Sequence, residues 1–401
     1  MAALTAGVLW AALTAWLLLR TLRQARAHAR LPAPTESDAA LPSVAVVLPV
    51  RNERANIAGC LERLLSQSGF PRGVPIVVVD DDSQDGTAEI AAEIALRHKQ
   101  IELRRLGTLP EGWLGKPHAC WCGAQGLETE FLCFIDADVR VAPPLLASAL
   151  TAARHLDIDM LSLAPFQVLG SFWERLIVPA ALVLIGCVID LRRVDDPSTE
   201  DIAVNGQILL VRRSVYLAVG GHAAVREEIC EDKALAARVK QGGWRYRLLD
   251  GGSLASTRMY TDLRSLWSGF AKNAVEIIGN PSHTLAVATA ALLIGWAALL
   301  LPLLTGLAAT AAPTPTTLAG FALALGGSLV ILAVQLGTAR HLRIPLAFGL
   351  LFPLAYTAVA LLALTSVVVR RSGRVRWKGR VCGVAAPAAP AVAGKRRAAA
   401  R

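Results

Sequence analysis

The stretch V-V-V-D-D-D-S-Q-D-G-T, from Val77 to Thr87, decides the fold. β-Preferring apolar residues lead directly into three adjacent carboxylates, Asp80 to Asp82, and a polar turn follows. Turn and helix-cap roles would explain Ser83, Asp85 and Thr87. They do not explain three adjacent acids, because like charges repel and a helix start needs only one. Since ligands of open α/β sheets bind where strands end, the stretch predicts a ligand site.

The composition indicates a globular domain attached to a membrane. The chain has 401 residues, of which 54% are hydrophobic and 18% charged, and its mean hydropathy is +0.47. The net charge of +10 comes from basic residues that gather beside apolar runs and at the C-terminus. This placement suits anionic lipid headgroups and cytosolic loops. We therefore expect a membrane as partner and no nucleic acid.

The N-terminal segment reads as an uncleaved membrane anchor. Residues 1–20 contain an uncharged run from Met1 to Leu19, and four arginines follow between positions 20 and 30. A cleaved signal peptide would carry positive charge before the apolar run. The order seen here predicts an anchor whose C-terminal side is cytosolic, followed by a basic, proline-containing linker over 21–42.

From Val44 the pattern alternates between strand and helix. Val44 to Leu48 and Val74 to Val79 are apolar runs with strand character, and Ile101 to Leu106 predicts a third strand. Helical periodicity over Ala55 to Leu65 and Thr87 to Arg97 separates them. This alternation predicts a parallel sheet with right-handed crossovers.

Two later features extend the predicted site. Leu109 to Ala124 reads as a loop that contains glycine and tryptophan, with Lys116 at its turn. The strand Phe131 to Ile135 then ends in D-A-D, with acids at Asp136 and Asp138. Two such acids can reach one divalent ion, and Mg²⁺ or Mn²⁺ binds through a few carboxylates and substrate phosphates. The combination predicts a site for a nucleotide diphosphate and a metal.

These motifs carry a family resemblance. The P-V-R-N-E loop (49–53), the D-D-D-S-Q-D-G-T turn, the D-A-D strand end and C-E-D-K (230–233) resemble, in order and spacing, family 2 glycosyltransferases with the GT-A fold. The resemblance covers about Ser43 to Asn280, so we assign 43–280 to this α/β domain. The strings G-W-L-G-K-P-H-A-C, Arg258 to Asn273 and W-K-G-R (377–380) are similar to the branch with hopene-associated, carotenoid and ceramide glycosyltransferases.

The resemblance implies a set of donor-binding residues. Glu53 and Asp81 match positions that recognise the uracil and ribose of a UDP-sugar, and the loop that holds Glu53 begins at Pro49. Lys116 lies where the family has a basic residue near the donor. Asp82 stands where many relatives have glycine, and its extra charge leaves open whether the nucleotide is UDP.

The resemblance also divides the later acids between two roles. Asp136, also on the donor side, and Asp138 match the pair that holds a metal, Mg²⁺ or Mn²⁺, and the diphosphate. Asp232 matches the base that deprotonates the acceptor hydroxyl. Glu231 is its nearest competitor, but on a helix it would point about 100° away, toward the acceptor or the interface. Transfer through an oxocarbenium-like state needs this division, because the leaving group and the acceptor proton lie on opposite faces of the sugar.

The acceptor side is expected at the membrane. We interpret 171–191 as an interfacial or re-entrant helix beside the active site, because its apolar run is short for a span. A buried core helix is the alternative. An amphipathic surface helix, or simple core packing, would explain Tyr260, Trp267 and Lys272. Contact with donor phosphate, or an interface anchor, would explain Trp377 and Arg380.

Membrane helices are predicted over 281–369. His283 to Leu307, Leu318 to Leu336 and Ile344 to Val369 are apolar runs, and a basic, low-complexity tail occupies 370–401. Three crossings would leave this tail outside, against the positive-inside tendency. Either the last run, which contains Pro345 and Pro353, is re-entrant, or the charge rule fails here.

The sequence thus predicts an inverting, metal-dependent glycosyltransferase. It would move a sugar from a nucleotide-sugar to a membrane lipid hydroxyl, with a hopanoid or other terpenoid lipid as the implied acceptor. The predicted location is the inner membrane, as a multi-pass protein whose catalytic domain is cytoplasmic. Two alternatives stay open. The acceptor could be a polyprenyl phosphate, which is already ionised, or the domain could be a non-catalytic partner in glycan binding or export.

Overall fold

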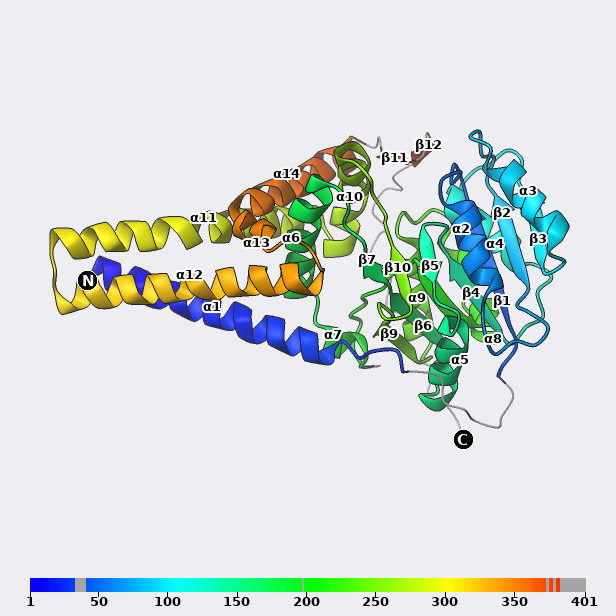
Figure 1. Cartoon of the computed structure of the whole chain (residues 1–401), viewed down its shortest axis with the longest axis horizontal. Helices are drawn as coiled ribbons and strands as arrows, with labels where there is room; N and C mark the ends of the chain where they lie inside the picture. Colours follow the sequence, from blue (N-terminus) through cyan, green and yellow to red (C-terminus); the bar gives the residue numbers. More distant parts are fainter. Residues whose placement is uncertain (33–40, 197, 373–374, 378–379, 383–401) are drawn as a thin grey trace, which may run out of the picture.

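The computed structural model describes residues 1–32, 41–196, 198–372, 375–377 and 380–382. It shows an α/β domain with a bundle of apolar helices at one end (Figure 1). Most of the predicted linker and of the basic tail lie outside the described residues. The helix α10 (Leu263–Ile278) ends just before α11 (Pro281–Ala311), so the boundary near residue 280 lies between two helices.

The α/β domain is built on a seven-stranded mixed sheet in the order β3-β2-β1-β4-β8-β6-β9. The predicted parallel arrangement is confirmed for the first four strands of that order. It does not extend to β8, a strand that was not predicted and is antiparallel to both of its neighbours. The strands are β1 (Val44–Val50), β2 (Ile76–Asp80), β3 (Ile101–Arg105), β4 (Phe131–Ile135), β6 (Met160–Ala164), β8 (Ile208–Arg212) and β9 (Tyr246–Asp250).

The reversed strand matters for the site. Ile208 at the start of β8 pairs with Ile135 at the end of β4. The loop that enters β8 therefore lies at the same edge as the D-A-D motif. If β8 were parallel to β4, the loop that leaves β8 would lie at this edge, and not the loop that enters it. The sequence pattern alone therefore did not place residues 205–207 here.

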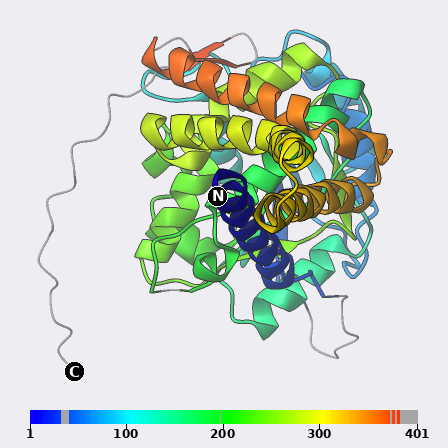
Figure 2. The ribbon, with the colours of Figure 1, turned by 90° about the vertical axis from the view of Figure 1, so that its left-hand side faces the viewer.

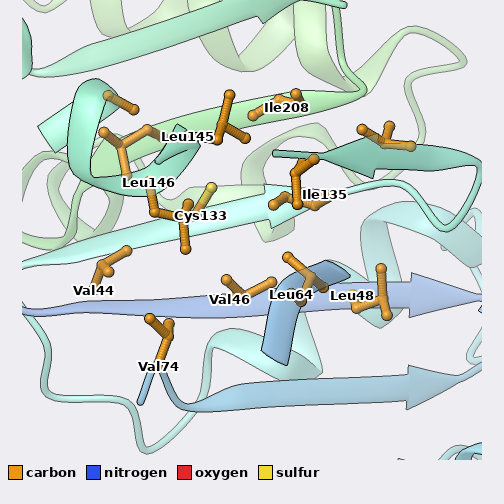
Figure 3. Packing of buried hydrophobic residues seen from close by; sticks show 14 of the residues in the cluster. Val44, Val46, Leu48, Leu64, Val74, Cys133, Ile135, Leu145, Leu146 and Ile208 are labelled. Atoms are coloured by element: carbon orange, nitrogen blue, oxygen red, sulfur yellow. The ribbon is translucent and has the colours of Figure 1, made fainter. Parts of the chain in front are cut away.

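Alternation along the strands divides the core between the two faces of the sheet. Val44, Val46 and Leu48 of β1 pack on one face, against α2 (Ile57–Leu65) and α5 (Leu145–His155) (Figure 3). Val47 packs on the other face, with α4 (Gly115–Ala124), α8 (Arg213–Ala218) and α9 (Glu231–Gln241). These two cores hold the strand ends rigidly, which is what a site at the sheet edge requires.

A small second sheet lies next to the D-A-D motif. Its strands β5 (Val139–Val141), β10 (Ala255–Thr257) and β7 (Phe166–Gln167) are hydrogen-bonded in that order. Because β5 begins directly after Asp138, this sheet links the motif to the segment that enters α10. The remaining elements of the domain are α3 (Thr87–Arg97), α7 (Leu191–Val194) and a 3₁₀ turn at Gly221–Val225.

Four helices are long and apolar enough to cross a membrane, among the residues that the structure describes. They are α1 (Ala2–Ala27), α11, α12 (Pro315–His341) and α14 (Phe352–Arg371). The first extends beyond the predicted limit at residue 20, so 21–27 is helical rather than linker. The arginines do not end the helix, because arginine is itself a good helix former.

Glycines bring the N-terminal helix close to α12. Figure 2 shows the two helices side by side, as seen from the far end of the bundle. A Cβ on Gly7 would lie 2.4 Å from the carbonyl oxygen of Gly320, and one on Gly327 would lie 2.6 Å from the Trp10 ring. Small residues of this kind allow helices to pack closely in lipid. The start of the chain therefore lies near the turn between α11 and α12, far from the α/β domain (Figure 1).

The last apolar helix stays at the domain end of the bundle. After α12, a short helix α13 (Ala347–Leu350) leads into α14. The start of α14 packs beside Gly295, roughly 21 Å along α11 from Pro281 at 1.5 Å per residue. Its end is tied to α10 by an ion pair between Arg370 and Glu276. This arrangement favours the re-entrant alternative for the last apolar run.

Two shorter helices join the bundle to the domain. The helix α6 (Phe172–Val188) corresponds to the segment that we interpreted as interfacial or re-entrant, and it packs against α14 and α1. Residues 176–181 are buried, as in the core-helix alternative, whereas Phe172 and Trp173 at its start are exposed. A capping box at its start uses Glu174, which also forms an ion pair of 3.0 Å with Arg258. The helix α10 lies between the domain and α14.

Candidate active site

Two loops at the carboxyl edge of the sheet clamp each other. The backbone N–H of Asn52 donates to Ser83 Oγ (2.9 Å), and Gln84 N–H donates back to Asn52 Oδ1 (2.9 Å). Glu53 N–H donates to Thr87 Oγ1 (2.8 Å). The side chains of Ser83 and Thr87 thus hold the loop that starts at Pro49, in addition to standing in the turn before α3, whose start has no side-chain cap bond.

An arginine neutralises the adjacent carboxylates. Arg51 lies 3.9 Å from Asp81 Oδ2 and 3.7 Å from Asp82 Oδ2, and its Nη1 donates to both backbone carbonyls. Asp81 is 4% exposed, whereas Asp82 is at the surface. Arg51 belongs to the P-V-R-N-E motif, but no role was predicted for it. A basic residue that can pair with two acids of the neighbouring loop is the feature that could have revealed its role.

Lys116 lies on a helix and not at a loop turn, because α4 already begins at Gly115. Its Nζ lies 2.8 Å from Asp136 Oδ1 and 3.2 Å from Glu231 Oε1. Burial alone would lower the pKa of Lys116, but the carboxylates of Asp136 and Glu231 outweigh it and hold the pKa well above its ordinary value. The ammonium group is therefore a fixed positive charge between the strand end and α9.

Asp232 is the second residue of α9, at the helix start where an acid is favoured. The Lys233 N–H donates to its Oδ1 (2.8 Å). A Cβ on Gly206 would lie only 2.5 Å from Asp232 Oδ2, so the turn before β8 needs glycine here. Burial and the charge of Glu231 raise the pKa of Asp232 to about 6, although Lys116 opposes this shift.

The helical offset of Glu231 from Asp232 suggested a position toward the acceptor or the interface. The structure places the Glu231 carboxylate next to Lys116. Glu231 is 7% exposed and faces Lys116. Its carboxylate shares the Lys116 ammonium group with Asp136. The difference arises because the lysine on α4 supplies the charge that a buried glutamate needs.

The D-A-D motif is held by the turn that enters β8. Asp136 N–H donates to the Gln207 carbonyl (3.0 Å), and the Val139 N–H donates to the Asp136 carbonyl (3.2 Å). Gln207 was not among the residues predicted for the site, because its position depends on the antiparallel strand. The described residues contain no group of three or more metal-binding side chains. Two carboxylates suit a metal ion whose other ligands are phosphate oxygens and water.

The residues predicted for the acceptor side are only partly brought together. Tyr260 precedes α10 and is buried beside Gly269 and Phe270, so it is not on a membrane-surface helix. Burial raises the pKa of Tyr260, and the charge of Asp138 raises it further. The Tyr260 ring therefore lies near the D-A-D motif. Trp267 is half-buried among apolar residues of the bundle, as in the core-packing alternative.

The other predicted residues lie farther along α10 and beyond it. Lys272 is close enough to Cys230 to lower the pKa of that thiol, although burial and nearby acids raise it overall to about 12. Trp377 and Arg380 lie on the paired strands β11 (Val375–Trp377) and β12 (Arg380–Cys382). The first of these strands contacts α10. The middle of the W-K-G-R string lies outside the described residues.

Comparisons with known proteins agree with this geometry. Residues 45–186 match the model of the family Glycosyl transferase family 2. The 4,4'-diaponeurosporenoate glycosyltransferase of Staphylococcus haemolyticus (strain JCSC1435) is 27% identical over 234 residues, which cover 58% of this chain and 60% of that protein. The protein of the same name from Staphylococcus aureus (strain USA300) is 25% identical over 264 residues, 65% of this chain and 68% of that one.

A solved structure has a similar fold. Mannosyltransferase PcManGT from Pyrobaculum calidifontis, in complex with GDP-Man and Mn²⁺, matches with a TM-score of 0.50 and 17% identity. The match covers 92% of this chain and 98% of that one. The mixed sheet with its charged carboxyl edge is thus a GT-A domain. Residues 45–186 therefore carry a domain that matches glycosyl transferase family 2, in agreement with the motifs, and the chain spans about three fifths of the length of the S. haemolyticus relative.

Proposed function

We propose that the chain transfers a sugar, with inversion, from a nucleotide-sugar to a lipid acceptor at a membrane surface. The observation that carries this proposal is the meeting of four charged side chains at one sheet edge, although they come from three separate parts of the chain. They are Lys116, Asp136, Glu231 and Asp232. A structural role alone would not require so many charges in one partly buried place.

The donor side of the edge supplies positive charge and hydrogen bonds. Asp81 and Glu53 stand on the clamped loops, where we infer that they orient the nucleoside. Lys116 is held as a cation and is the group that can meet the diphosphate. When the negative diphosphate binds, it competes with Asp136 and Glu231 for this ammonium group. The nucleotide itself, UDP or another, is left open by these contacts.

Asp136 and Asp138 are the residues that would hold a divalent metal together with the donor. Bound there, Mg²⁺ or Mn²⁺ would neutralise the charge that develops on the leaving diphosphate. The family relationship and the D-A-D strand end support this role. Lys116 contributes from the side of α4, because its positive charge stands between Asp136 and Glu231.

Asp232 is the proposed proton acceptor for a lipid hydroxyl. It is separate from the D-A-D pair, and its pKa of about 6 lies close to neutral pH, where a general base works best. We infer that the acceptor approaches from the side of α10, since this helix contacts the start of α9. The terpenoid character of the acceptor rests on the named relatives and the resemblance in the motifs.

A second acceptor chemistry follows from those relatives. The compound in the names of both relatives, 4,4'-diaponeurosporenoate, has the ending "-oate", which denotes a carboxylate. A carboxylate is already ionised at neutral pH and has no proton to lose, as would also hold for a polyprenyl phosphate. The deciding experiment incubates membranes with labelled nucleotide-sugars and separately added lipid alcohols and lipid acids. Labelled products from neither would contradict the proposed function.

The transfer rate should depend on pH through Asp232. If a hydroxyl is the acceptor, the rate should rise between about pH 5 and about pH 7, because the carboxylate loses its proton near its pKa of about 6. The measurement is the rate at saturating donor in wild type and in Asp232→Asn. The rise should be absent in the variant, and a rise of equal size there would assign the titration to another group.

The chain should have its start outside the cytosol and its last helix ending inside. A reporter at the N-terminus should lie outside, because α1 begins at the far end of the bundle. Reporters inserted near Glu128 and after Arg371 should both lie inside, since the end of α14 is tied to α10. An N-terminal reporter on the same side as the Glu128 reporter would mean that α1 does not span. An outside reporter after Arg371 would mean that α14 crosses fully.

A further inference from the structure

An apolar groove runs between four helices at the domain end of the bundle. Its walls come from α6, α10, α11 and α14, and they form a shallow, partly open groove with an internal volume of about 50 Å³. Every residue that lines it is apolar, including Ile185, Phe270, Ala274, Ile277, Leu362 and Ala363. Two of the helices, α11 and α14, are among the candidate membrane spans. The groove is therefore placed where it could open to lipid.

One helix connects this groove with the proposed base. Lys233, the neighbour of Asp232, donates from its Nζ to the carbonyls of Glu276 (2.7 Å) and Ile277 (3.4 Å) on α10. The side chain of Ile277 lines the groove. The groove and the start of α9 thus contact neighbouring faces of the same helix, and the distance between them is about the width of one helix.

The groove is apolar inside, and charged residues lie beside it, on the other face of α10 and at the end of α14. Lys272 and Glu276 lie on the polar side of α10, and Glu276 is paired with Arg370 at the end of α14. This distribution matches an amphiphile, which has an apolar chain and a polar end group. It does not match a soluble ligand, for which an apolar wall on all sides would offer no hydrogen bonds.

We propose that this groove binds the hydrocarbon tail of the acceptor and thereby places its end group next to Asp232. The inference rests on the proposed function and adds the place and chemistry of acceptor recognition. The occupant is a single linear hydrocarbon chain, of fatty or isoprenoid type. For acceptors short enough to dissolve in water, KM should fall about threefold to fourfold per added methylene until the groove is filled, because each methylene moves from water into an apolar site.

The first test blocks the groove. Ala274→Trp on α10 and Ile185→Trp on α6 fill it from opposite walls, and Leu293→Trp on the exposed face of α11 (64% exposed) is the matched control. With hexadecanol or palmitate as acceptor, KM should rise at least tenfold in both groove variants and stay unchanged in the control. With butanol or butyrate, rates should be unchanged in all three. Thermal unfolding and donor binding confirm that the variants are folded.

A second measurement does not depend on transfer. A hexadecanol analogue with a diazirine on its chain is photolysed with the full-length protein in detergent, and the labelled peptides are identified by mass spectrometry. Labels on α6, α10 and α14 that palmitate competes away would support the groove even if no sugar is transferred, in which case only the proposed function fails. Transfer to hexadecanol with unchanged KM in both groove variants, or with labels elsewhere, would overturn the inference.

Discussion

Asp232→Asn should lower turnover by about 10²- to 10⁴-fold while donor affinity is retained. Asparagine keeps the size and hydrogen bonding of the side chain but removes its basicity. Gly206 leaves space for either side chain, so the fold should tolerate the change. The measurements are product formation at saturating donor with a lipid alcohol as acceptor, and donor binding by calorimetry. Asp157→Asn, at an exposed aspartate just after the end of α5, is the matched control.

A substitution of Glu231, the neighbour of Asp232, distinguishes an effect on donor binding from an effect on turnover. Because Glu231 faces Lys116, Glu231→Gln should cost less turnover than Asp232→Asn and should act mainly on donor affinity. The assignment of Asp232 as base fails if Asp232→Asn weakens donor binding and leaves turnover at saturation intact. If it changes neither, the acceptor is already ionised, and a carboxylate or phosphate acceptor is favoured.

Asp138→Ala should abolish the metal-dependent part of donor binding. The described chain offers no third metal-binding side chain next to the D-A-D pair, so loss of one carboxylate removes half of the protein ligands. Calorimetry with a nucleotide-sugar in the presence of Mn²⁺ or Mg²⁺, repeated with EDTA, measures the effect. Glu62→Ala, at an exposed position on α2, is the control. Binding that is the same with and without EDTA, in wild type and variant, would contradict the metal site.

Local patterns predicted much of the α/β domain. The strands after Val44, Val74 and Phe131 were recognised because buried parallel strands are continuous apolar runs, and their ends were marked by acids. The helix Thr87–Arg97 was predicted to the residue, since the turn before it has strong conformational preferences. These features depend on neighbours in the chain, and a sequence carries that information directly.

Other features depended on packing between distant segments. Residues 115–124 form the helix α4 where a loop was expected, and the lysine in its first turn is held by two carboxylates, at the strand end and on α9. Tyr260 appeared to belong to a surface helix, but contact with Gly269 buries it. In both cases a tertiary contact outweighed the local preference, which is worth only a fraction of a kcal/mol per residue.

The sequence by itself determined the resemblance to a family, the GT-A fold, the two acidic strand ends and the number of long apolar runs. Only the tertiary structure decided that β8 runs antiparallel, that Glu231 turns to Lys116, and that α14 returns to the domain end. The physical reason is the same in each case. Strand direction, the partner of a buried charge and the depth of an apolar helix are set by contacts between residues far apart in the chain, and no local periodicity records them.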